Sequence, residues 1–110
     1  MLLYWIYLLL AIGCEVLGTT LMKISNGFTK LIPSILVVVF YILTLPFFTL
    51  ALKKINVSVA YAVWSGIGTA SIAIIGYILF KEQMNPVKIA AIVMIIAGIV
   101  MLNLSDVTRG

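Results

Sequence analysis

Four apolar stretches dominate the chain, and short polar links separate them. They cover about residues 2–22, 32–52, 57–80 and 87–104, and each has the roughly 20 residues that a helix needs to cross the hydrocarbon core of a bilayer. Inside a bilayer the backbone must satisfy its own hydrogen bonds, and four segments are too few to close a barrel. The pattern therefore predicts an all-α membrane protein with four transmembrane helices, organised as a single integral-membrane domain over residues 1–110.

The start of the first stretch resembles the apolar core of a signal peptide. However, no basic residue precedes Leu2, and the apolar run continues to Met22, which is long enough to span. We therefore expect a membrane span here and not a cleaved leader.

Composition supports an integral membrane protein, because 65% of the residues are hydrophobic, 9% are charged and the mean hydropathy is +1.31. A soluble domain carries about 25% charged residues. The net charge of +4 comes from links and tail, which predicts contact with anionic lipid head groups and argues against nucleic acid as a partner. The sequence contains no metal-ligand cluster, nucleophile–base set or phosphate-binding loop, so we expect no enzyme, no cofactor and no metal.

The link charges bear on orientation. Four spans place both termini on one side of the bilayer, together with Lys53, Lys54 and Arg109. The other side carries Lys23, Lys30, Lys81 and Lys88. A difference of one charge gives the positive-inside rule no clear preference. Either the chain has one weakly biased orientation, or it inserts both ways and forms an antiparallel dual-topology homodimer.

Glu15 is the one acidic or basic residue of the first stretch. A carboxylate at mid-membrane depth costs about 2.5 kcal/mol or more, so it implies a function or a partner. Apart from Lys88 at the edge of the fourth stretch, no Lys, Arg or His lies within the four stretches. The positive partner of Glu15 is therefore expected to be a proton or a cationic ligand.

Several small side chains share the helical face of Glu15. Helical spacing places on that face Leu8, Ala11, Ile12, Gly18, Thr19 and Met22, of which Ala11, Gly18 and Thr19 are small. Small residues of this kind either let two helices pack closely or leave room for a ligand. Both interpretations are compatible with a pocket around the carboxylate.

The third stretch places Tyr61, Trp64 and Gly68 on one face. Aromatic residues in a membrane helix can belong to the interfacial belt, but the glycines Gly66 and Gly68 follow at once and would weaken the helix. We favour a cation pocket with an adjacent hinge, because a ring face attracts an ammonium group by about 0.5–2 kcal/mol. Tyr41 of the second stretch is a weaker candidate for the same pocket and could equally be a packing residue.

The fourth stretch carries small residues that recur seven apart, with methionines beside them. These are Ala90, Ala91, Met94, Ala97, Gly98 and Met101. A seven-residue repeat of small side chains is typical of a helix contact, so this stretch is predicted to hold a dimer together. Lys81, Glu82 and Lys88, which precede that stripe, are expected to be solvated.

Several blocks together resemble the small multidrug resistance transporters. They are residues 14–23 (CEVLGTTLMK), 27–29 (GFT), 33–34 (PS), 60–68 (AYAVWSGIG) and 97–98 (AG). The resemblance covers the whole chain. It implies an antiparallel homodimer of four-helix subunits that exchanges protons for cationic substrates.

The same resemblance implies roles for individual residues. The shared carboxylate of the family corresponds to Glu15, the substrate-stacking tryptophan to Trp64, and the gating or hydrogen-bonding tyrosines to Tyr41 and Tyr61. The matching pocket wall is Leu8, Ala11, Ile12, Gly18 and Thr19.

Two segments of the sequence bear on which branch of the family the chain resembles. The guanidinium exporters of the family carry a tryptophan just after the glutamate, whereas residues 18–20 here are GTT, which is similar to the drug-exporting branch. Residues 57–61 (VSVAY) resemble the polyamine exporters, which work as heteromeric pairs.

The expected function is a proton-coupled antiporter that exports lipophilic or quaternary ammonium cations across the cytoplasmic membrane of a bacterium. Protons and substrate would compete for the paired Glu15 carboxylates. Two alternatives stay open. One is a polyamine or guanidinium exporter of the same family, and the other is a non-transporting assembly subunit in which Glu15 pairs with a basic residue of a partner helix.

Overall fold

The computed structural model describes the backbone of residues 2–109 and the side chains as far as Ser105. Four helices account for most of it: α1 (Leu2–Ile24), α2 (Leu31–Ala51), α3 (Val57–Leu79) and α4 (Pro86–Arg109). All four are long and apolar enough to cross a membrane, which confirms the prediction of an all-α protein with four spans. At 1.5 Å per residue, helices of 21 to 24 residues measure about 32–36 Å.

Local signals explain where these helices stop and start. Between α1 and α2 the chain reverses through Asn26, Gly27 and Phe28, which have φ angles of 51°, 69° and 66°. The buried Ser25 stabilises this turn, because its hydroxyl donates to the Met22 carbonyl and accepts from the Phe28 amide. Such left-handed conformations end a helix and favour glycine.

The start of α4 shows a side-chain cap. Pro86 occupies the first helical position, and the side-chain oxygen of Asn85 accepts a hydrogen bond from the Lys88 amide at 2.8 Å. Both features satisfy or remove amide donors that the first turn of a helix leaves unpaired.

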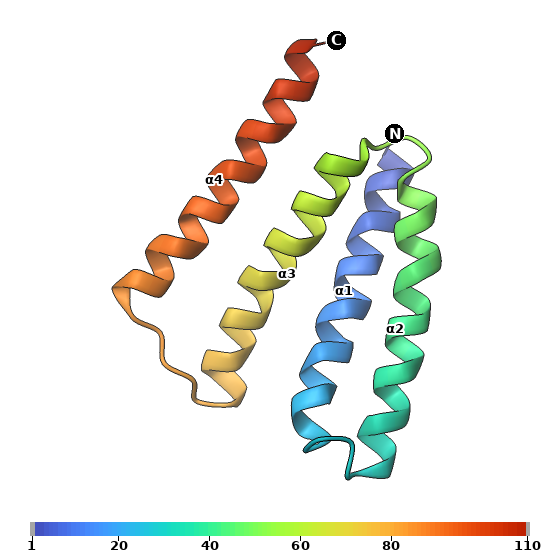
Figure 1. Cartoon of the computed structure of the whole chain (residues 1–110), viewed down its shortest axis with the longest axis vertical. Coiled ribbons are helices and arrows are strands. Elements are labelled where there is room, and N and C mark those ends of the chain that lie inside the picture. The colour runs from blue at the N-terminus through green and yellow to red at the C-terminus, as the bar shows by residue number, and fades with distance from the viewer. Residues whose placement is uncertain (1, 110) are drawn as a thin grey trace.

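The helices form a layer one helix thick (Figure 1). Its order is α2, α1, α3, α4, because α1 packs against both α2 and α3 while α4 packs against α3. The molecule measures 49 × 36 × 17 Å, and 17 Å is less than two stacked helices of about 10–12 Å each. Many large apolar side chains of the layer are consequently exposed.

A small core joins α1 to the end of α2, the link that follows it and the start of α3. Leu8, Ile12 and Val16 of α1 are buried there. Their buried neighbours are Ala51, Ile55, Val59 and Ala60. This contact fixes α3 beside α1 and so determines which residues of α3 face Glu15.

Helix α4 contacts α3 at a glycine. A Cβ on Gly66 would collide with Cδ1 of Ile99 and would lie 2.9 Å from Cγ2 of Ile95. None of the residues Pro86–Ser105 is buried. The predicted small-residue stripe is exposed, with Met94 and Met101 each about 70% accessible (73% and 69%), and its role in dimer contact stays a prediction.

The Gly66 contact yields a first prediction. Gly66→Val should lower the stability of the protein in dodecyl maltoside by about 1–3 kcal/mol, because overpacking displaces Ile95 and Ile99. Thermal unfolding followed by circular dichroism measures it. Gly13→Ala is the matched control, since nothing lies within 4 Å of a Cβ at that helical glycine. If Gly66→Val were as stable as Gly13→Ala, the packing of α4 on α3 would be wrong.

Candidate functional site

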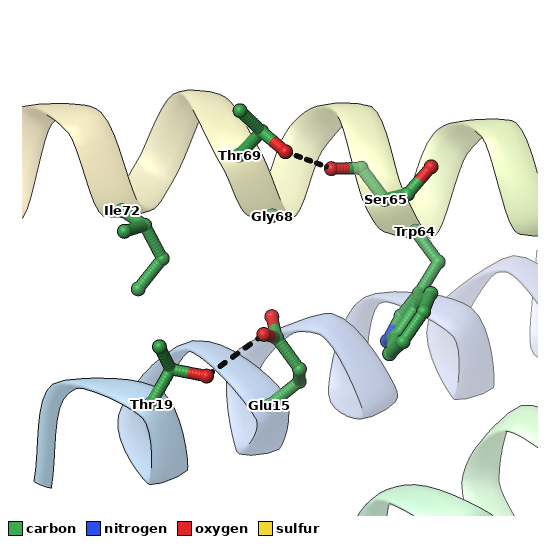
Figure 2. A pocket seen from close by; sticks show the side chains of 7 residues that line it. All are labelled: Glu15, Thr19, Trp64, Ser65, Gly68, Thr69 and Ile72. Atoms are coloured by element: carbon green, nitrogen blue, oxygen red, sulfur yellow. Dashed lines mark hydrogen bonds between the residues drawn. The ribbon is translucent and has the colours of Figure 1, made fainter. Parts of the chain in front are cut away.

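Glu15 is half-buried in the middle of α1 and faces α3 (Figure 2). The Thr19 hydroxyl, one helical turn further on, donates to its Oε1 at 2.9 Å. The same Thr19 oxygen lies 2.5 Å from the Tyr41 hydroxyl of α2. Since Thr19 donates its proton to Glu15, Tyr41 must be the donor to Thr19. The structure therefore places three predicted residues in one chain of hydrogen bonds that ends on the carboxylate.

On the opposite side, α3 approaches the carboxylate through a glycine. A Cβ on the buried Gly68 would lie 3.0 Å from Oε2 of Glu15. This is tighter than ordinary van der Waals contact, so the absent side chain is what admits the carboxylate to this position. A hinge at Gly66 and Gly68 stays a prediction. Each glycine also has a packing reason, since Gly66 admits side chains of α4 and Gly68 admits the Glu15 carboxylate.

A cavity of about 320 Å³ lies between α1 and α3 beside the carboxylate (Figure 2). Its lining residues are Glu15 and Thr19 from α1, and Trp64, Ser65, Gly68, Thr69 and Ile72 from α3. Helices α2 and α4 supply no lining residue among those that the structure describes. The wall is thus largely apolar, with one acidic group.

Trp64 forms one end of this cavity. Its ring centroid lies 5.4 Å from that of Phe48 and 5.7 Å from that of Tyr61, so it belongs to an aromatic cluster. Its indole Nε1 is buried and has no hydrogen-bond partner within the described chain. A buried unpaired donor costs about 1–3 kcal/mol relative to a hydrogen-bonded one.

The charge of Glu15 has no internal counter-ion among the described side chains. Among these side chains, an ion pair joins Lys23 to Glu82. It lies at the end of the layer that carries the α1–α2 and α3–α4 links, which we call the loop end. An acidic group, ring faces and apolar walls together are typical of a site for an organic cation.

The family model for the Small Multidrug Resistance protein matches residues 3–108. The chain belongs to the Small Multidrug Resistance family. Its membership confirms the resemblance predicted from the sequence, and the four spans make it a multi-pass bacterial membrane protein.

Curated relatives of the family cover nearly the whole chain. It is 55% identical over 102 residues to the uncharacterized membrane protein YvaE of Bacillus subtilis, covering 93% of this chain and 86% of YvaE. It is 44% identical over 100 residues to the multidrug resistance protein EbrB of the same species, covering 91% and 86%. It is 42% identical over 100 residues to the quaternary ammonium compound-resistance protein QacE of Escherichia coli, covering 91% of each.

The structure brings together some of the predicted site residues and separates others. Glu15, Thr19, Trp64 and Gly68 line the cavity. Tyr61 does not line it, but its ring contacts the ring of Trp64. Gly18 packs against the Tyr41 ring, which would lie 2.9 Å from a Cβ there. The remaining predicted wall residues are buried away from the lining: Leu8, Ala11 and Ile12.

Three lining residues were not predicted, namely Ser65, Thr69 and Ile72. Ser65 lies four residues after Tyr61, Thr69 four after Ser65 and Ile72 four after Gly68, and this helical spacing was the signal that could have identified them. The hydroxyls of Ser65 and Thr69 donate to the carbonyls of Tyr61 and Ser65, at 2.8 and 2.6 Å. Both hydroxyls donate their protons within α3. In this arrangement their oxygens face a ligand as hydrogen-bond acceptors.

A second prediction concerns the hydrogen bond to the carboxylate. Thr19→Val keeps the shape of the side chain and removes the donor that stabilises the charged Glu15. Binding of benzyltrimethylammonium, measured by calorimetry, should weaken by about tenfold, or about 1.4 kcal/mol. Thr49→Val is the matched control, because this exposed threonine donates to the Leu45 carbonyl of its own helix. Equal affinities in the two variants would exclude a role for the Thr19 hydroxyl.

Proposed function

We propose that this chain is a proton-coupled antiporter that exports lipophilic or quaternary ammonium cations. Family membership supports drug efflux as its function, and the relatives EbrB and QacE are named for resistance to multiple drugs and to quaternary ammonium compounds. The observation that carries the proposal is the Glu15 carboxylate in an apolar cavity without a counter-ion among the described side chains.

The cavity suits a small hydrophobic cation. Its volume of about 320 Å³ lies at the lower end of the range for small-molecule sites, roughly 300–1,000 Å³. The ammonium group would lie against Glu15, and the hydrophobic body would lie against Ile72 and the ring of Trp64. A cation over an aromatic face gains about 0.5–2 kcal/mol, depending on how far it is desolvated.

Exchange follows from exclusive occupancy of one group. A protonated Glu15 is neutral and has no attraction for a cation, whereas a deprotonated Glu15 requires one. Protons and substrate therefore compete for the carboxylate, and each leaves when the other binds. The Tyr41–Thr19 hydrogen bonds orient the carboxylate for either occupant.

The functional unit is an antiparallel pair of copies, each a single integral-membrane domain in the bacterial cytoplasmic membrane. Two features of one copy support this part of the proposal. The cavity wall comes from α1 and α3 of a layer one helix thick, so a second layer can close it and contribute a second Glu15. The small-residue stripe of α4 is exposed and forms the contact.

A third prediction tests the coupling. Glu15→Gln should abolish proton-driven transport of benzyltrimethylammonium into liposomes, because an amide neither titrates nor carries charge. Glu15→Asp should retain transport with a shifted pH optimum. Binding to the wild type should also weaken as the pH falls, since protons occupy the same carboxylate. Proton-driven accumulation by Glu15→Gln liposomes would disprove the proposal.

The same liposomes separate the proposal from its alternatives. Spermidine and guanidinium, tested beside benzyltrimethylammonium, report whether a polyamine or guanidinium ion is the preferred substrate. A chain that binds none of these cations by itself would instead support an assembly subunit.

A fourth prediction tests the antiparallel pair. Lysines added after Arg109 should drive the terminal side to the cytoplasm, whereas Lys53→Gln with Lys54→Gln should drive the opposite orientation. Each biased variant alone should transport poorly, and the two expressed together should recover activity. Cysteines introduced in loops of a Cys14→Ser variant and labelled from each side report the orientation. An active wild type with a single orientation would leave a parallel pair or a hetero-oligomer.

A further inference from the structure

A second cavity, of about 140 Å³, adjoins the first toward the loop end of the layer. The two cavities share the lining residues Thr19 and Ile72, so they meet along the groove between α1 and α3. The outer cavity is closed at its far side by Lys23 of α1, Phe80 and Glu82. We refer to it as the outer cavity.

The position of Glu82 is built into the end of α3. The amides of Phe80 and Glu82 both donate to the Gly76 carbonyl, at 3.1 and 3.0 Å. Lys81 between them has a φ of 55°, which turns the chain back. The Glu82 carboxylate then lies against Gly76, where a Cβ would collide with its Oε1. Glu82 is exposed, as expected for a solvated link charge, but its carboxylate also has a fixed place beside Gly76.

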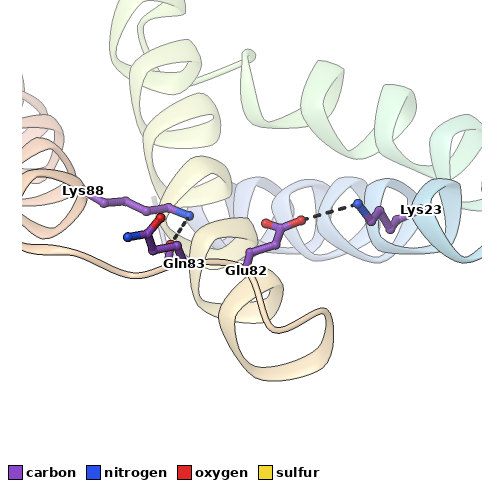
Figure 3. A network of polar contacts seen from close by, with 4 residues as sticks. All are labelled: Lys23, Glu82, Gln83 and Lys88. Carbon is purple, nitrogen blue, oxygen red and sulfur yellow. Dashed lines mark hydrogen bonds and ion pairs between the residues drawn. The ribbon is translucent and has the colours of Figure 1, made fainter.

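An ammonium group of the chain itself lies at the outer cavity, because Lys23 lines it and pairs with Glu82 (Figure 3). Nζ of Lys23 lies 3.7 Å from Oε2 of Glu82 and 5.8 Å from the centroid of the Phe80 ring. A carboxylate and an aromatic face around one ammonium is the arrangement by which proteins recognise organic cations. Lys88, the other lysine in Figure 3, donates instead to the Gln83 carbonyl at 3.1 Å.

The Lys23 ammonium is weakly held. The Lys23 and Glu82 side chains are 61% and 43% exposed, and exposed ion pairs of this kind contribute about 0.2–1 kcal/mol. A ligand with its own ammonium group can replace Lys23 and gain the same two contacts. Ile72 and Ile75 also line the outer cavity, so the apolar groups of a ligand can pack against them.

We propose that the outer cavity is a second cation site, which takes the ammonium head of a substrate on the way to or from Glu15. Glu82 and Phe80 bind the head group, and Lys23 is its resident competitor. With less than half the volume of the Glu15 cavity, the outer site accepts a head group and not a large hydrophobic body. The inference rests on the proposed transport of organic cations.

The test uses the full chain with Glu15→Gln, so that binding at the inner carboxylate is removed. Tetramethylammonium is titrated into this variant in dodecyl maltoside, and the methyl resonances of Ile72 and Ile75 are followed by NMR. We expect a saturable shift of Ile75. Adding Glu82→Gln should abolish saturation. Adding Lys23→Gln should tighten binding about two- to fivefold, the factor that an exposed ion pair supplies. Adding Lys30→Gln, the matched control at an exposed lysine that lines neither cavity, should change nothing.

The outcomes distinguish the two proposals. If the Ile75 shift is independent of Glu82, or if Lys23→Gln does not tighten binding, the outer site is wrong. That result would leave the antiporter intact, because wild-type transport is measured separately. Conversely, Glu82-dependent binding in a chain whose wild type does not transport would keep the site and reject the antiporter.

One further arm identifies the source of the ammonium. The titration is repeated with phosphatidylethanolamine added to the micelles. Unchanged affinity for tetramethylammonium assigns the site to a soluble cation, as proposed. A clear loss of affinity would assign it to a lipid head group and overturn the role in transport.

Discussion

An acidic side chain inside an apolar layer is the constraint from which the rest of the structure follows. Glu15 cannot be placed among hydrocarbon without a donor, a proton or a cation. In this chain the Thr19 hydroxyl donates a hydrogen bond to the carboxylate from one side. On the other side Gly68, which has no side chain, leaves room for it. The absence of a side chain at Gly68 lets the carboxylate face a cavity, and the ring of Trp64 borders the same space.

Much of this arrangement could be predicted from the sequence, because it depends on single helices. Length and hydropathy determine the four spans, and an isolated carboxylate identifies Glu15 as the centre of the site. Trp64 and Thr19 follow from helical spacing. Leu8 and Ile12 satisfy the same spacing, yet they pack into the core with Ile55 and Val59. The periodicity of one helix shows which residues share a face and leaves open which neighbour covers them.

The loop end of the layer was harder to predict for a related reason. The Lys23–Glu82 pair joins residues that are 59 positions apart in sequence (82 minus 23). It depends on the left-handed conformation of Lys81 and on two amides that share the Gly76 carbonyl. Neither feature has a strong local signature, since lysine rarely adopts a positive φ. Contacts of this kind become visible only once α1 and α3 are placed side by side.

Helix α4 has a consequence for how such proteins diverge. Among the described residues, those that line the two cavities come from α1, α3 and the segment just after α3, whereas α4 packs on its subunit through contacts that include Gly66 and Leu102. Changes along its exposed side leave the chemistry of the cavities untouched. If α4 forms the proposed dimer contact, a duplicated gene that changes only α4 would alter the choice between like and unlike partners and leave the residues that line the cavities unchanged. Under the proposed pairing through α4 and the proposed binding at Glu15, partner choice and cargo choice would be encoded in separate segments of a very short chain.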